Sequence, residues 1–384
     1  MRDFTYWNPT KIVFGRGAVD RVGELVPSDA TVLITYGGGS IKRNGVYERI
    51  RTALGGAALV EFGGIEPNPR YETLMKAVAL AKEKGVDFLL AVGGGSVLDG
   101  TKFIAAALPY DGADPWDIIE KHAPVQSATP IGAVLTLPGT GSESNGNAVI
   151  SREETRDKLG FGSQALFPRF AVLDPETTFS LPERQTANGV VDAFAHVLEQ
   201  YMTYDVNAPL QDRQAEALLV TLVEQGPKVL AHPNDYDTRA NIMWCATQAL
   251  NTLIACGVPQ DWATHGIGHE LTALYGIDHA RTLAVVFPAL LRHQKDRKRG
   301  KLLQYAARVW GLVDGDEDAR IDAAIEKTEA FFRGMGIPTR LKDYDVTDGY
   351  LEVAERIGRR GGGLGEHGDI GEKEVAEILA LCAA

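Results

Sequence analysis

One aspartate and a group of histidines have the residue types and the spacing of a metal site. Asp192 and His196 are four residues apart in an apolar stretch, so on a helix they would share one face with Cβ atoms about 5–6 Å apart. Downstream, His265, His269 and His279 place three of the chain's eight histidines within fifteen residues. Carboxylates and imidazoles bind Fe²⁺ or Zn²⁺. Asp192, His196 and two of the later histidines therefore predict a site for one divalent cation.

The spacing alone leaves alternatives open. A hydrogen bond between Asp192 and His196 would explain this pair without a metal, although a lone carboxylate in apolar surroundings is costly. His265 and His269 are also four residues apart, so both could reach one cation. Peptidase chemistry is disfavoured, because Glu270 follows the second histidine and the order H-E-x-x-H is absent. The serine-nucleophile motif G-x-S-x-G is absent as well.

Three loops rich in glycine and hydroxyl groups follow predicted strands, at residues 37–40, 93–96 and 136–142. Backbone N–H groups at a strand-to-helix turn bind phosphate, and glycine lets the phosphate approach. The second loop, Gly-Gly-Gly-Ser, differs from the G-x-G-x-x-G fingerprint. Because parallel strands end at one edge of a sheet, the three loops together predict a dinucleotide site there.

The first of these loops indicates which dinucleotide binds. A carboxylate after this strand would contact both ribose hydroxyls of NAD and repel an added 2′-phosphate. The loop contains no acid, and Ser40, Lys42 and Arg43 follow it. These residues tolerate or attract a phosphate, so the sequence favours NADP(H) over NAD(H).

The predicted secondary structure that must position these residues changes near Leu181-Pro182 from alternating strands and helices to helices alone. Before this point, apolar and β-branched runs alternate with helical patterns, which predicts a parallel sheet covered on both faces. The expected strands are 31–36, 58–62, 88–92, 131–137 and 170–173. Beyond it, helical periodicity recurs with almost no strand signal. We therefore expect an α/β dinucleotide-binding domain over residues 1–182 and an all-helical, metal-binding domain over 183–384.

Composition narrows the classes of protein. The net charge of −12 argues against nucleic-acid binding. The longest apolar run spans nine residues, far below the roughly 20 that a membrane helix needs, and the first residues contain no signal core. The basic stretch 292–301 is interpreted as a solvated helix end or loop. The three cysteines form no C-x-x-C pair, which favours a reducing, cytoplasmic location.

At this point the chain resembles the iron-containing alcohol dehydrogenases, and within them the bacterial NADPH-dependent aldehyde reductase and butanol dehydrogenase branch. The resemblance covers nearly the whole chain, in the segments 9–17, 93–102, 137–143 and 266–279. It implies a dehydroquinate synthase-like architecture with the active site in the cleft between two domains, and a homodimer. It also implies NADP(H)-linked hydride transfer with small aldehydes or primary alcohols, the metal polarising the substrate oxygen.

The resemblance assigns roles residue by residue. It gives the metal Asp192, His196, His265 and His279, and it leaves His269 beside the nicotinamide as the candidate for proton transfer. The cofactor contacts carried over by matching motifs are Gly38, Gly39, Ser40, Asn68, Gly94, Gly95, Ser96, Asp99, Thr136, Thr140, Asn145 and Lys158.

Two other functions are disfavoured by the sequence. A sibling of the same architecture, a glycerol dehydrogenase or a dehydroquinate synthase, is disfavoured because the segments around Asp192 and His265 are apolar, whereas a polyanionic substrate needs a basic pocket. A dinucleotide-sensing protein without catalysis is disfavoured because all four candidate ligands are present.

Overall fold

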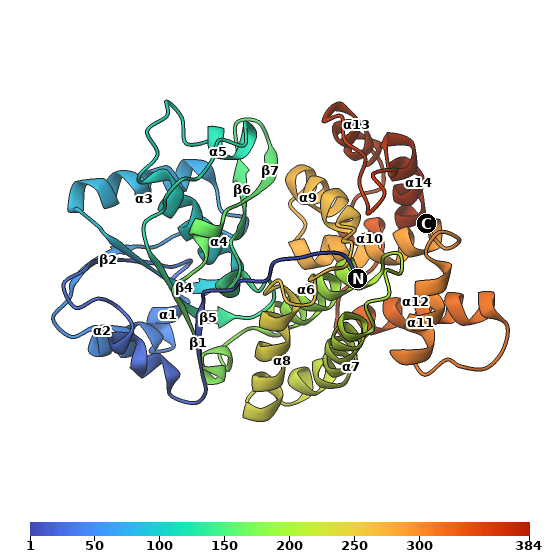
Figure 1. Cartoon of the computed structure of the whole chain (residues 1–384), viewed down its shortest axis with the longest axis horizontal. Coiled ribbons are helices and arrows are strands. Elements are labelled where there is room, and N and C mark those ends of the chain that lie inside the picture. Colours follow the sequence, from blue (N-terminus) through green and yellow to red (C-terminus); the bar gives the residue numbers. More distant parts are fainter. The chain divides into compact units, whose positions relative to one another are not determined.

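The apolar runs of the first half form one parallel sheet, as the sequence predicts, and the sheet has six strands rather than the five expected (Figure 1). The computed structural model describes residues 1–384. The strands of this sheet are β1 (Lys11–Phe14), β2 (Thr31–Thr35), β3 (Ala58–Phe62), β4 (Phe88–Gly94), β5 (Ile131–Leu137) and β8 (Phe170–Leu173). Helices on both faces are α1 (Ser40–Arg43), α2 (Val46–Leu54), α3 (Tyr71–Lys84), α4 (Gly95–Ala107) and α5 (Asp117–Glu120), with the 3₁₀ helices η1 (Ala18–Glu24), η2 (Ser142–Ser144), η3 (Gln164–Leu166) and η4 (Pro175–Thr178).

Alternate residues of each strand pack in two separate hydrophobic cores, because successive side chains of a strand point to opposite faces of the sheet. In β4, Leu89 and Ala91 pack in the core that also contains α3 and α4. Phe88, Leu90 and Val92 pack in the core that contains η1 and α2. A strand buried on both faces must be apolar throughout, which explains why these strands read as continuous apolar runs.

The strand order β1-β8-β5-β4-β2-β3 contains a reversal next to β2. From β2 the chain moves outward to β3, and it then returns to the other side of β2 as β4. The turns after β2 and β4 therefore leave the sheet in opposite directions, and such a switch point opens the crevice in which α/β sheets bind ligands.

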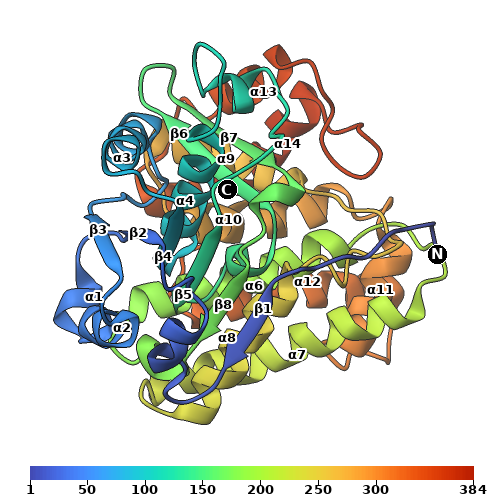
Figure 2. The ribbon, with the colours of Figure 1, turned by 60° about the vertical axis from the view of Figure 1, so that its left-hand side comes forward.

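Two features of this unit were not predicted from the sequence. The edge strand β1 has only four residues, too few for a periodic signal. The antiparallel hairpin of β6 (Asn147–Arg152) and β7 (Asp157–Gly162) packs its first strand against α4 (Figure 2). Glycines and charges interrupt its alternation, and its stability comes from contact with α4 rather than from a pattern of its own.

The second half is helical, as predicted. Its helices are α6 (Glu183–Tyr201), α7 (Pro209–Ala231), α8 (Tyr236–Ala249), α9 (Ala263–Tyr275), α10 (His279–His293), α11 (Arg299–Arg308), α12 (Glu317–Gly334), η5 (Leu341–Tyr344), α13 (Leu351–Arg359) and α14 (Glu372–Ala383). The chain forms two compact units: residues 7–182 with 233–247, and residues 1–6 with 183–232 and 248–384.

The basic stretch 292–301 spans the end of α10, a turn and the start of α11, as a helix end or loop would, but it is only partly solvated, contrary to the interpretation from the sequence. Lys298 and Lys301 are 5% and 8% exposed. Lys301 pairs with Asp212 at 2.8 Å, and Arg292 lies against the buried Glu329. A lysine can be buried when its charge is paired and hydrogen-bonded, and this pairing depends on residues far apart in sequence. All three cysteines are free and buried, and none of the helices is both long and apolar enough to span a membrane.

Candidate metal centre and cofactor loops

Helix α6 is buried and largely apolar, but one of its faces carries a stripe of polar side chains. Asn188, Asp192, His196 and Glu199 follow one another at intervals of four, four and three residues, so they lie on one face. All four side chains are less than 9% exposed. The apolar residues between them on the helix, such as Val190, are buried as well. Since a buried polar group is stable only with polar partners, this face requires partners from other elements of the helical unit.

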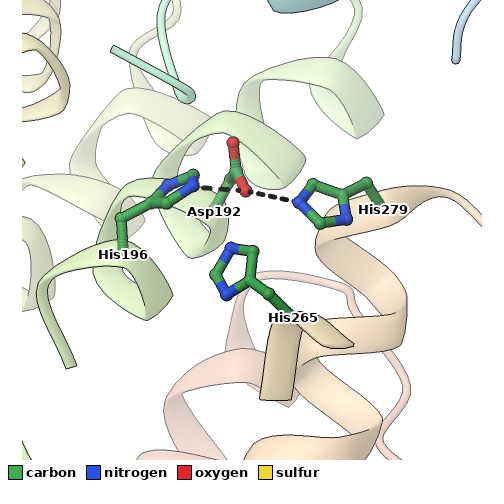
Figure 3. Close-up of side chains that lie close together, drawn as sticks. All are labelled: Asp192, His196, His265 and His279. Carbon is green, nitrogen blue, oxygen red and sulfur yellow. Dashed lines mark ion pairs between the residues drawn. The ribbon is translucent and has the colours of Figure 1, made fainter. Parts of the chain in front are cut away.

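The partners are histidines from α9 and α10, and together they make a compact cluster (Figure 3). One ligand atom from each of Asp192, His196, His265 and His279 lies within 4.8 Å of the others. Asp192 Oδ1 lies between two rings, 3.7 Å from His196 Nδ1 and 3.7 Å from His279 Nε2. His265 approaches from α9, with its ring centroid 4.7 Å from that of His196.

The donor set fits one divalent transition metal. A carboxylate and three imidazoles suit Fe²⁺ or Zn²⁺, and their number leaves room for a substrate atom. Each of the four ligand atoms can reach a common point, because they are separated by no more than 4.8 Å. His269 is not part of this group. It lies one turn after His265 on α9, with its ring centroid 5.2 Å from that of His279.

The elements on either side of the cluster are tied to α6. Glu199 Oε1 accepts a hydrogen bond from the backbone N–H of His265 at 2.9 Å and lies 2.9 Å from Nδ1 of the same residue. Asn188 Nδ2 donates to Asp278 at 3.0 Å, and Asp278 immediately precedes His279. The helix that carries two of the candidate ligands therefore also contacts His265 directly, and the residue before His279.

Glu199 lies in an unusual electrostatic environment. Burial and the neighbouring Asp261 raise its pKa well above the ordinary value, opposed by the N–H of His265 and the ammonium of Lys298. A cation held by His265 would oppose this upward shift, because opposite charge nearby lowers a carboxyl pKa. Lys298 itself is buried, and its Nζ lies 2.7 Å from Asp261 and 2.8 Å from Glu366.

The residues assigned to the cofactor all lie in the sheet unit, and several gather after β2, β4 and β5. Gly38, Gly39 and Ser40 form the turn from β2 into α1. Gly94, Gly95 and Ser96 form the turn from β4 into α4, and Asn68 N–H donates to Ser96 Oγ at 3.3 Å. Thr136 is the second-to-last residue of β5, and Thr140 lies in the loop that follows. The predicted loops are thus brought to the switch point of the sheet.

The loops after β4 and β5 touch at a glycine. A Cβ atom on Gly95 would lie 2.4 Å from Thr140 Cγ2 and 2.7 Å from Thr140 Oγ1. No larger residue fits without moving the loop, so the absence of a side chain here sets the distance between the two turns.

The remaining assigned residues surround the buried Lys102, which is not itself among the residues assigned to the cofactor. Lys102 donates to Ser142 Oγ at 2.8 Å and to Asn145 Oδ1 at 3.0 Å. Burial lowers its pKa to about 8, opposed by Asp99 and Glu143. Asp99 accepts from Ser142 Oγ at 2.6 Å and from the N–H of Val149 at 2.9 Å.

Burial raises the pKa of Asp99, opposed by Lys102 and by Lys158 of β7. Lys158 is 5% exposed. This group of charges and hydroxyls fixes the loop from residue 140 to residue 145, and its partners are up to 50 residues apart in sequence.

Lys42, which the sequence suggests as an attractive charge for a 2′-phosphate, already has a partner of opposite charge. Lys42 Nζ lies 2.7 Å from Glu61 Oε2 and over the rings of Tyr36 and Tyr47, so its charge is already paired. Arg43 instead reaches back to the loop, with Nη1 3.4 Å from the carbonyl oxygen of Gly38. The pairing of Lys42 was not visible in the sequence, because Glu61 comes from the adjacent strand β3.

Matches to known families agree with this geometry. Residues 9–175 match the model of the iron-containing alcohol dehydrogenases, and residues 186–380 match that of the C-terminal part of the same family. The chain therefore belongs to the iron-containing alcohol dehydrogenase family, and the recognition made from its motifs is confirmed.

Individual relatives are similar over almost their full length. The NADPH-dependent aldehyde reductase YqhD of Escherichia coli is 60% identical over 90% of each chain, and a crystal structure of E. coli YqhD matches 99% of each chain with a TM-score of 0.98. A probable NADH-dependent butanol dehydrogenase of Bacillus subtilis is 44% identical over 99% of each chain.

A structure from Thermotoga maritima, described as an NADH-dependent butanol dehydrogenase A, is 37% identical. It matches with a TM-score of 0.95 over 100% of this chain and 99% of its own. The predicted fold class, an α/β unit with a parallel sheet and a helical unit in the dehydroquinate synthase-like arrangement, is confirmed by these neighbours.

The assignment of His279 rather than His269 to the metal gives the first prediction. His279→Ala should lose bound metal, because three remaining ligands hold a cation more weakly. His269→Ala should keep its metal, because His269 is outside the four-residue cluster. Elemental analysis of both purified variants, with Asp192→Ala as the control that loses metal, measures this. Metal lost from His269→Ala and retained by His279→Ala would show that the wrong histidine was chosen.

Proposed function

We propose that the protein is a metal-dependent, NADP(H)-linked aldehyde reductase and alcohol dehydrogenase that acts on small aldehydes and primary alcohols. The observation that carries this proposal is that a chain 60% identical to an NADPH-dependent aldehyde reductase keeps Asp192, His196, His265 and His279 together in one cluster. In the reduction, a hydride passes from NADPH to the carbonyl carbon, the carbonyl oxygen takes a proton, and NADP⁺ and the alcohol leave.

The residues of the chain divide this work. A divalent cation held by the four ligands would supply Lewis acidity toward the substrate oxygen. His269 is our candidate for supplying or relaying the proton, since it lies beside the ligands without belonging to their group. The turns at Gly38 to Ser40 and Gly94 to Ser96 would bind the dinucleotide through backbone N–H groups, which supports hydride transfer by orienting the donor.

The proposal predicts turnover that requires the metal. The purified protein, reconstituted separately with Fe²⁺ and Zn²⁺, should oxidise NADPH in the presence of short aldehydes, measured as loss of NADPH absorbance. Asp192→Ala treated in the same way should have lost most of this activity, because it binds the cation weakly. No turnover with a panel of short aldehydes and either metal would contradict the proposal.

Preference for NADP(H) is part of the proposal, and the relatives make it worth testing because their names include both NADPH and NADH. Support comes from the first loop, which has no carboxylate and is approached by Arg43. Gly39 has a φ of 80°, so a side chain there would be strained. Gly38 has open space around its Cβ position and no such φ, and it is the better place for a new charge.

Gly38→Asp should lower kcat/KM for NADPH relative to that for NADH by about tenfold or more, because the carboxylate repels the 2′-phosphate. The matched control is Gly56→Asp, which adds the same charge in the same unit at another open glycine. The measurement is the ratio of the two kcat/KM values for each protein. An unchanged ratio in Gly38→Asp would mean that this loop does not face the 2′-phosphate.

We also propose that the enzyme is a homodimer. Strand β1 lies at an edge of the sheet, and Phe14 is exposed there beside Trp244, which is also exposed. An edge strand with exposed aromatic residues offers backbone groups and apolar surface to a second copy. Light scattering coupled to size-exclusion chromatography should give about twice the chain mass of 41.5 kDa. The mass of a single chain would exclude this assembly.

Two further proposals follow from the sequence analysis. We propose a cytoplasmic location, supported by three free thiols that form no disulfide. We also propose that residues 1–182 act as the cofactor domain and residues 183–384 as the metal domain, with residues 1–6 packing in the helical unit and the segment 233–247 in the sheet unit.

A further inference from the structure

Glu199 is the only member of the α6 stripe whose side chain the proposed function does not use and that contacts a proposed ligand directly. It is 1% exposed. Its Oε1 lies 2.9 Å from Nδ1 of His265 and 2.9 Å from the backbone nitrogen of the same residue. One carboxylate oxygen therefore fixes both the backbone and the ring of His265.

The direction of these hydrogen bonds sets the state of the ring. A backbone N–H can only donate, so Oε1 is an acceptor at this point. The contact with Nδ1 is then satisfied when Nδ1 carries the proton. In a neutral imidazole this leaves the lone pair on Nε2, the nitrogen that can bind a cation.

The backbone around Glu199 and His265 reinforces the contact. The N–H of Asp261 donates to the carbonyl oxygen of Glu199 at 2.9 Å. His265 is the third residue of α9, where backbone N–H groups have no acceptor within the helix and favour a negative charge. Glu199 thus also satisfies the start of α9, which places this helix against α6.

A buried lysine holds the same helix start from the other side. Lys298 Nζ donates to Asp261 Oδ2 and to the carbonyl oxygen of Met202, both at 2.7 Å, and to Glu366 at 2.8 Å. Asp261 Oδ1 accepts from the N–H of Ala263, the first residue of α9. The end of α6 and the start of α9 are therefore joined through paired buried charges, and Glu199 need not hold them alone.

We propose that Glu199 is a positioning residue for the metal centre: its carboxylate holds His265 in the Nδ1–H tautomer, with Nε2 directed to the cation. This inference rests on the proposed role of His265 as a ligand. It assigns to α6, beyond the two ligands Asp192 and His196, the control of a third.

The test measures metal affinity rather than turnover. Glu199→Gln keeps the size of the side chain but removes the negative charge, and it should weaken Co²⁺ and Zn²⁺ binding by about 10- to 100-fold, as for loss of a hydrogen-bond partner of a ligand. Affinity is measured for each metal alone by competition with a chelator. The visible spectrum of bound Co²⁺ should change as well, because the imidazole is less well oriented.

The matched control is Glu329→Gln. Glu329 is a buried glutamate of the helical unit whose partners are Arg292, Arg333, Arg340 and Thr339, and none of them is a proposed ligand. This variant should lower the melting temperature and leave metal affinity within about twofold of the wild type. If Glu199→Gln behaves like this control, Glu199 is merely structural and the proposal fails.

The wild-type protein provides a second test that does not depend on a variant folding. In the Zn²⁺-loaded protein with ¹⁵N-labelled histidine, NMR should find the proton of His265 on Nδ1 and slow to exchange, with the signal assigned by its loss in His265→Asn. A proton on Nε2 would overturn the role given to Glu199. Loss of Zn²⁺ from Asp192→Ala, measured separately, tests the metal site itself, so failure of the two ideas can be distinguished.

Discussion

The structure of the helical unit depends on one constraint, that a row of polar side chains on a buried helix must find polar partners. Asn188, Asp192, His196 and Glu199 lie on one face of α6, and each is nearly inaccessible to solvent. An unpaired polar group in such a place costs several kcal/mol. The starts of α9 and α10 supply the partners, so the cluster of candidate ligands and the packing of three helices satisfy the same requirement.

The sheet unit meets a different constraint with different means. Its candidate cofactor turns consist largely of glycine, serine and threonine at the ends of parallel strands, where backbone N–H groups can bind a phosphate. The spacing between turns is set by close contacts, as between Gly95 and Thr140, and by the buried Lys102 that ties residues 142 and 145 together. In this unit the candidate binding groups therefore belong to the backbone, and their positions depend on the shape of the turns.

Sequence patterns predicted those parts that depend on local periodicity or on short spacing. Fully buried strands such as β4 are apolar throughout, and the pair Asp192 and His196 is visible as an interval of four on a helix. The edge strand β1 and the hairpin of β6 and β7 were missed because their stability comes from neighbours. Glu199 and Lys298 were missed for the same reason, since a glutamate or a lysine acquires its role only when the fold buries it beside a distant partner.

The two constraints imply different sensitivity to substitution. A backbone site tolerates change in any side chain that keeps the turn, and relatives with similar folds are accordingly named for either NADPH or NADH. The candidate metal cluster is more restrictive, because each candidate donor atom belongs to a side chain, and the ring of His265 also contacts Glu199. We therefore expect cofactor preference to change more readily, at exposed positions such as residue 38, than the candidate ligands on α6 and its partner helices.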